Sequence, residues 1–140
     1  MKKGVNIAKA VRALFVLAAL VLEILPLGAV MTFSLVNESG QAVYIYETYS
    51  YFSMMPFGYA MFFYMICGVM TAICLLLSVL QTVGRGKSQT AHIVLLSIAG
   101  VCSAFPYLFG TFNVVTVMIT AVIAAALGIS IYLWVKEQRT

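Results

Sequence analysis

Four long apolar runs constrain this chain more than any other feature. They cover residues 13–36, 57–80, 93–109 and 114–135. Each is close to the ~17–25 residues with which an α-helix crosses a bilayer. Only helices and closed barrels satisfy their backbone in lipid, and these runs lack the apolar–polar alternation of barrel strands. We therefore predict an all-α membrane protein, in which a bundle of four transmembrane helices makes residues 1–140 a single integral membrane domain.

The composition agrees with this class of protein. Of 140 residues, 64% are hydrophobic and 9% are charged, whereas an ordinary soluble domain carries about 25% charged residues. The chain has no Asp and a single His, which is His92. Its three cysteines lie inside the apolar runs at a spacing that matches no zinc or redox motif, so we expect reduced, buried thiols. They are Cys67, Cys74 and Cys102.

The basic residues lie outside the four runs and on one side of the predicted helices. The positive-inside rule makes that side cytoplasmic, with both termini on it. We expect a multi-pass protein of the plasma membrane, which in a bacterium is the cytoplasmic membrane. The positive charge favours anionic lipid head groups and requires no nucleic-acid partner. The residues are Lys2, Lys3, Lys9, Arg12, Arg85, Lys87, Lys136 and Arg139.

The one sizeable segment outside the runs is "NESGQAVYIYETYSYFSMMP", residues 37–56, between the first and second runs. It begins as a turn and becomes aromatic. One interpretation is an aromatic belt at the membrane surface, with a short helix lying on that surface. The other is a docking surface, or a lid over an outward-facing cavity. The predicted outer aromatic surface consists of Tyr44, Tyr46, Tyr49, Tyr51 and Phe52.

Small residues within the runs indicate where helices approach closely, because hydrophobicity alone does not hold helices together in lipid. We expect packing within the bundle, with a dimer seam on the fourth helix as the alternative. Pro26 and Pro106 are expected to kink the first and third helices. The predicted packing residues are Gly68, Gly100, Ala121, Ala124, Ala125 and Gly128.

Glu23 is a single carboxylate inside the first run. At 1.5 Å per residue it lies about 15 Å from residue 13, near the middle of a ~30 Å hydrocarbon core. Thr71 and Ser103 are the best hydrogen-bonding candidates at its level, and no Lys, Arg or His lies within a predicted span. Three interpretations stay open. Glu23 is a neutral, satisfied carboxyl, or it pairs with a cation from a binding partner, or it is a site that carries a proton or cation.

The motifs of common enzyme classes are absent. The sequence contains no HExxH, no GxSxG and no phosphate-binding loop, so we expect no enzymatic activity, cofactor or metal. The first functional hypothesis is a non-enzymatic accessory or scaffold subunit of a larger membrane complex. The alternative is a small oligomeric transporter, coupled to protons or cations, that uses Glu23. The expected partners are the lipid bilayer and either a larger complex or further copies of the chain.

Overall fold

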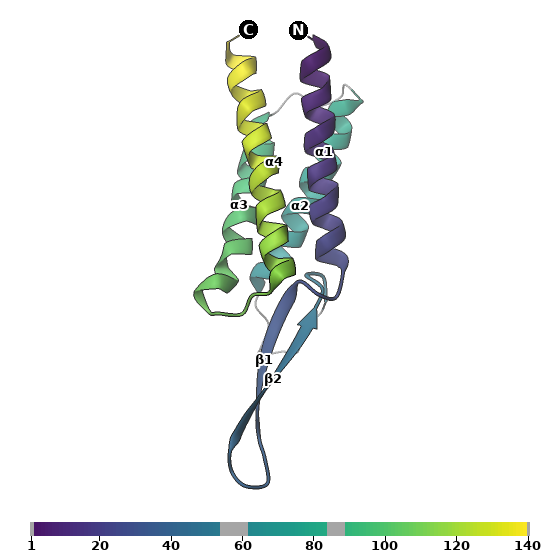
Figure 1. Cartoon of the computed structure of the whole chain (residues 1–140). Coiled ribbons are helices and arrows are strands. Elements are labelled where there is room, and N and C mark those ends of the chain that lie inside the picture. The colour runs from purple at the N-terminus through teal and green to yellow at the C-terminus, as the bar shows by residue number, and fades with distance from the viewer. Residues whose placement is uncertain (1, 54–61, 84–88, 140) are drawn as a thin grey trace.

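The structure, a computed structural model, describes residues 2–53, 62–83 and 89–139. Four helices lie side by side, and a pair of strands projects beyond one end of them (Figure 1). Both termini lie at the opposite end. In chain order the elements are α1 (Lys2–Ile24), β1 (Ala29–Val36), β2 (Ala42–Tyr49), α2 (Phe62–Thr82), α3 (Gln89–Leu108) and α4 (Val114–Gln138). We call α1–α4 the helical body.

Three of the described helices, α2, α3 and α4, are long and apolar enough to cross a membrane. They correspond to the second, third and fourth apolar runs. α3 begins at Gln89 rather than at residue 93, and α4 continues to Gln138. The predicted start of the second run, at residue 57, lies outside the described residues.

The first apolar run is not one helix, which corrects the prediction for residues 13–36. α1 ends at Ile24, and Ala29–Val36 forms β1. Pro26 has no N–H to continue the helical hydrogen bonds, and Leu27 N instead donates to Leu25 O (2.8 Å). Pro26 therefore lies beyond the end of α1 instead of kinking it, whereas Pro106 lies inside α3.

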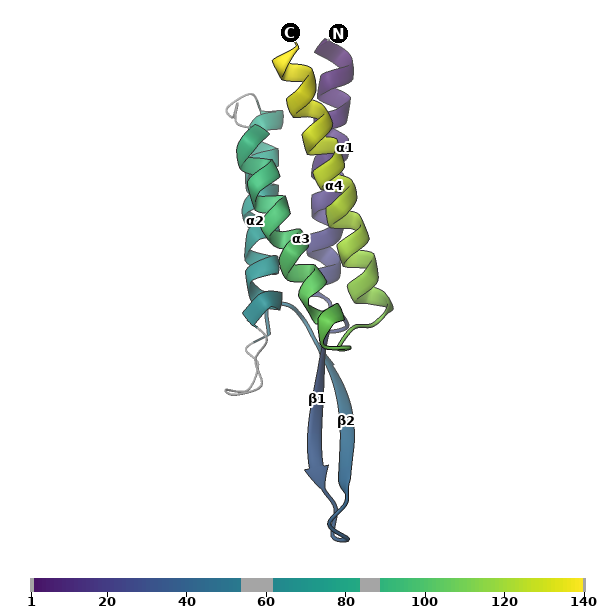
Figure 2. The ribbon, with the colours of Figure 1, turned by 90° about the vertical axis from the view of Figure 1, so that its left-hand side faces the viewer.

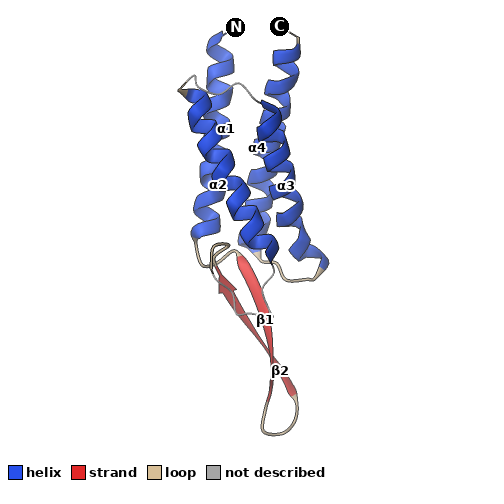
Figure 3. Cartoon of the chain, turned by 180° about the vertical axis from the view of Figure 1, so that it is seen from behind, coloured by secondary structure: helices blue, strands red, loops and turns tan. Residues whose placement is uncertain are grey.

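β1 and β2 form an antiparallel β-hairpin, so the all-α prediction and the surface helix predicted after the first run are both wrong (Figure 3). The register runs from the Ala29–Tyr49 pair to the Val36–Ala42 pair. Asn37 organises the turn, since its side-chain oxygen accepts from Gln41 N (2.8 Å). Gly40 has a φ of 79°, which glycine adopts at little cost.

The foot of the hairpin is inserted into the helical body. Ala29 and Tyr51 are fully buried and share one hydrophobic core with Ile119 of α4. A Cβ on Gly28 would lie 3.0 Å from both Ile119 and Tyr51, so only a glycine fits there without a shift. In Figure 2 the strands accordingly begin at the helix ends and extend away from them.

The predicted packing residues divide into two groups. Gly68 is buried, and a Cβ there would lie 2.8 Å from the Phe52 ring, while a Cβ on Gly100 would meet Ile123 at 3.8 Å. The four small residues of α4 are exposed, and two of them, Ala125 and Gly128, line a groove beside Val11 of α1. The alternative dimer seam on this face stays a prediction. These residues are Ala121, Ala124, Ala125 and Gly128.

Candidate functional site

Glu23 is fully buried one residue before the end of α1. The Thr71 hydroxyl is hydrogen-bonded to Glu23 Oε2 (2.5 Å), and the Cys67 thiol lies 3.4 Å from Oε1. Thr71 comes nine residues after Phe62, or about 14 Å along α2. Glu23 therefore lies level with the middle of α2, and the predicted contact with Thr71 is present.

Ser103, the second predicted partner, does not contact Glu23. It is fully buried on α3, and its hydroxyl donates to Gly100 O of its own helix (2.9 Å). Glu23 instead contacts the chain leaving the hairpin, because Tyr51 N donates to Glu23 O (2.9 Å). The Tyr51 ring packs against Tyr64 with the ring centroids 4.8 Å apart. Glu23 thus joins the end of α1 both to α2 and to the foot of the hairpin.

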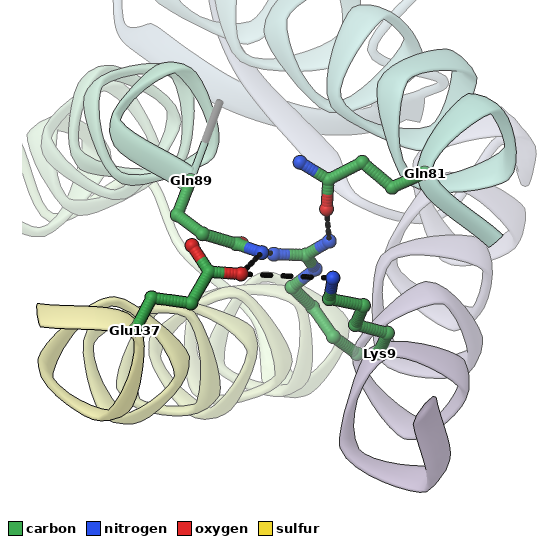
Figure 4. Close-up of polar contacts among 5 residues, drawn as sticks. Lys9, Gln81, Gln89 and Glu137 are labelled. Carbon is green, nitrogen blue, oxygen red and sulfur yellow. Dashed lines mark hydrogen bonds and ion pairs between the residues drawn. The ribbon is translucent and has the colours of Figure 1, made fainter. Parts of the chain in front are cut away.

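A second buried charge lies toward the termini. Arg12 is fully buried and donates from Nη1 to Gln89 Oε1 and from Nη2 to Gln81 Oε1, both at 2.6 Å. Gln89 Nε2 then donates to Glu137 Oε1 (3.0 Å), and Lys9 Nζ lies 3.6 Å from the same oxygen. Figure 4 shows these side chains converging from all four helices. We call them the Arg12 cluster.

The Arg12 cluster was not predicted, because Arg12 was expected in the basic segment before the first span and not among the buried side chains. The sequence feature that could have predicted the burial of Arg12 is its spacing to Glu23. The buried residues Arg12, Val16, Ala19 and Glu23 of α1 follow a four-three-four spacing, which places them on one helix face. His92 is likewise buried on α3.

The inward face of α2 connects the levels of Glu23 and Arg12. Its buried residues are all polar, aromatic with a hydroxyl, or small: Tyr64, Cys67, Gly68, Thr71, Cys74, Ser78 and Gln81. The large aliphatic side chains of α2 are exposed, among them Leu76 at 61% and Val79 at 49%. This arrangement suits a helix whose outer surface meets lipid and whose polar groups turn inward. The three cysteines are free and buried, as predicted.

The hairpin has two unlike faces. Successive residues of a strand point to opposite faces, and paired residues of the two strands point to the same face. The pairs Phe33–Ile45 and Leu35–Val43 form an apolar face. Within it Leu35 is 54% exposed, Val43 44% and Ile45 40%. No described helix covers these three side chains.

The opposite hairpin face carries Tyr44 and Tyr46, which are exposed as predicted. Phe52 is also exposed, at 39%, although its ring lies beside Gly68, whereas Tyr51 is fully buried and corrects that part of the prediction. Tyr49 lies near the foot and donates a hydrogen bond to Glu47. This bond favours the neutral phenol and raises the pKa of Tyr49 above its usual value.

Comparisons with protein-family models, curated proteins and solved structures find no match to this chain. Its function is therefore inferred from its own geometry. Two features carry that inference, the uncovered apolar face of the hairpin and the polar interior around Glu23.

Proposed function

We propose that this chain is a non-enzymatic accessory or scaffold subunit of a membrane complex. All four helices cross the plasma membrane, with both termini in the cytoplasm and the hairpin outside. The apolar surfaces of α2, α3 and α4 support this placement. So does the distribution of charge, because Lys and Arg concentrate at the terminal end and are absent from the hairpin. α1 runs beside α2 from Arg12, which contacts Gln81, to Glu23, which contacts Thr71, and the buried foot of the hairpin follows it.

The apolar face of the hairpin carries the proposal. A two-stranded hairpin is at best marginally stable in water, and antiparallel sheets normally pack their apolar face on a core. Here the face containing Leu35, Val43 and Ile45 is exposed. Each buried Å² of such a surface contributes roughly 25 cal/mol. The outer edges of both strands also present unpaired backbone groups. A partner that covers this face stabilises the hairpin and is recognised by it.

The charges of the hairpin indicate what kind of partner fits. Glu38 and Glu47 are the only charged residues between Glu23 and Arg85. A second copy in the same orientation would have its basic residues at the opposite end of the helical body. The partner is therefore a different protein, whose outer part offers an apolar groove flanked by Lys or Arg.

The test compares two identical substitutions on opposite hairpin faces. Val43→Ser alters the apolar face, whereas Val36→Ser alters the other face, where Val36 is 72% exposed. Native mass spectrometry from membranes should find a stoichiometric second protein with the wild type and with Val36→Ser. That protein should be lost with Val43→Ser. A photo-crosslinker at Leu35 should attach to the same protein. Recovery of the chain alone, or equal behaviour of both variants, would contradict the proposal.

A transporter coupled to protons or cations is the second candidate. The polar inward face of α2, which includes Thr71 and Ser78 and lies against Glu23, favours it. Under this function the purified chain in vesicles carries a proton-coupled flux that Glu23→Gln abolishes without loss of helical content. Under the accessory function the purified chain carries no flux.

A further inference from the structure

The surroundings of Glu23 contain polar groups but no described cation at its level. α2 contributes Cys67 and Thr71, and α4 contributes Ile119, Ile123 and Ala126 to the same core. Arg12 is three helical turns away on α1, or about 16 Å. The other titratable groups of this region are Tyr51 after β2, Tyr64 on α2, and Cys102 and Tyr107 on α3. An ionised carboxylate buried without a cation costs several kcal/mol, even after relaxation.

The hydrogen bonds around Glu23 lack one proton. The Thr71 hydroxyl has a single hydrogen but three acceptors within reach: Glu23 Oε2 (2.5 Å), Cys67 O (3.0 Å) and Gly68 O (3.0 Å). The Cys67 thiol also has one hydrogen, for Glu23 Oε1 and Ala99 O, both at 3.4 Å. A proton on Glu23 Oε2 removes the excess of acceptors around the Thr71 hydroxyl. Glu23 then donates to Thr71, and Thr71 donates to a carbonyl of its own helix.

Tyr51 supplies an independent observation at the same place. Its side chain is fully buried, and its hydroxyl has no hydrogen-bond partner among the described residues. It interacts electrostatically with Glu23 and Cys67. A buried hydroxyl without a partner requires an explanation. The Tyr51 hydroxyl is available to donate a hydrogen bond to a Glu23 carboxylate after the proton of Glu23 has left.

We propose that Glu23 is a proton-binding site, in which one exchangeable proton bridges the carboxyl group and the Thr71 hydroxyl. The buried side chains of Arg12, Gln81 and Gln89 close the site toward the termini, and those of Tyr51 and Tyr64 close it toward the hairpin. Exchange of the proton requires one closure to open. Because Tyr51 N donates to the backbone oxygen of Glu23, the foot of the hairpin is held beside the site. The site rests on neither the accessory nor the transport function.

The test is infrared difference spectroscopy of the purified chain in lipid nanodiscs at neutral pH, wild type minus Glu23→Gln. Glu38, Glu47 and Glu137 are present in both samples and cancel. The difference should contain the C=O stretching band of a protonated carboxyl, which shifts in D₂O. Thr71→Val should move that band to higher frequency, because the carboxyl loses its acceptor. Ser103→Ala, at the same level but not bonded to Glu23, should leave the band in place. A pair of carboxylate bands in place of the protonated band overturns the proposal.

A second measurement needs only the wild-type chain, in case Glu23→Gln fails to fold. Dicyclohexylcarbodiimide is lipid-soluble and adds the O–H of a protonated carboxyl across its N=C bond. The resulting O-acylisourea rearranges to an N-acylurea that retains the full mass of the reagent. We expect one adduct per chain, on the peptide that contains Glu23. An unmodified Glu23 in a chain with its native helical content would count against the site.

Discussion

At the scale of single residues, α1 buries two charged side chains and gives both of them neutral partners. Arg12 donates to two amide oxygens, and Glu23 meets a hydroxyl and a thiol. Neutral partners satisfy hydrogen-bonding groups without the cost of desolvating a second charge. The consequences differ, because a guanidinium cannot lose its proton in a protein whereas a carboxyl can gain one. Arg12 therefore acts as a fixed tie between helices, and Glu23 as an exchangeable site.

The Arg12 tie can be tested with Arg12→Met. We expect the free energy of unfolding to fall by about 3 kcal/mol, because two buried amide oxygens lose their donors and α1 is released from α2 and α3. Unfolding in mixed micelles, followed by circular dichroism, measures the change. Arg139→Met, at the exposed end of α4, is the control and should change stability by less than about 0.5 kcal/mol. Equal stability of the two variants would show that the Arg12 cluster ties nothing together.

At the scale of elements, the α1–β1 boundary shows where hydrophobicity stops being informative. A continuous apolar run over residues 13–36 has the length of one span, and an apolar stretch alone does not distinguish a buried strand from a helix. The residues that interrupt the run do distinguish the helix from the strand. Pro26 and Gly28 break the run, "NESG" is a turn, and Val43–Tyr46 alternates apolar and aromatic residues. α3 and α4 were predictable because no such break interrupts their middle.

The candidate site was predictable in part. A lone acid in an apolar run identifies Glu23 directly, and equal rise per residue identifies Thr71 as its neighbour. Ser103 was not excluded by that count, because depth along a helix says nothing about which face a side chain occupies. Tyr51 was predicted to be part of the outer surface because it lies in the aromatic segment between the first two runs. Its burial depends on how the hairpin foot enters the helical body, which is a long-range contact without a local signal.

The start of α4 holds the turn between α1 and β1, and Asn113 is the residue to test. Its side chain accepts from Thr116 N (2.9 Å) as the helix cap and donates to Leu27 O (2.5 Å). Asn113→Ala should lower the free energy of unfolding by about 1–2 kcal/mol. Asn113→Asp keeps the cap but loses the donor to Leu27, so its free energy of unfolding should lie between those of the wild type and Asn113→Ala. The same micelle titration measures both variants. An alanine variant as stable as the wild type would mean that this cap is dispensable.

At the scale of the whole molecule, α2 has the reverse polarity of a helix in a soluble protein. Large aliphatic side chains face outward on α2, and polar ones line its inner face. The two ends also differ. The hairpin end carries two glutamates and an uncovered apolar face, whereas the opposite end carries the termini and the Arg12 cluster. A bilayer around the helices would account for the outer surface, and the proposed partner would account for the exposed hairpin.

The most direct test of this account is the side of the membrane on which each end lies. Ser39→Cys places a thiol at the exposed hairpin turn, and Arg139→Cys places one near the C-terminus, while the native cysteines are buried. A membrane-impermeant maleimide applied to intact cells should label Ser39→Cys. It should label Arg139→Cys only after the membrane is opened. Labelling of both positions in intact cells, or protection of both, would contradict a chain that crosses the membrane and carries its hairpin outside.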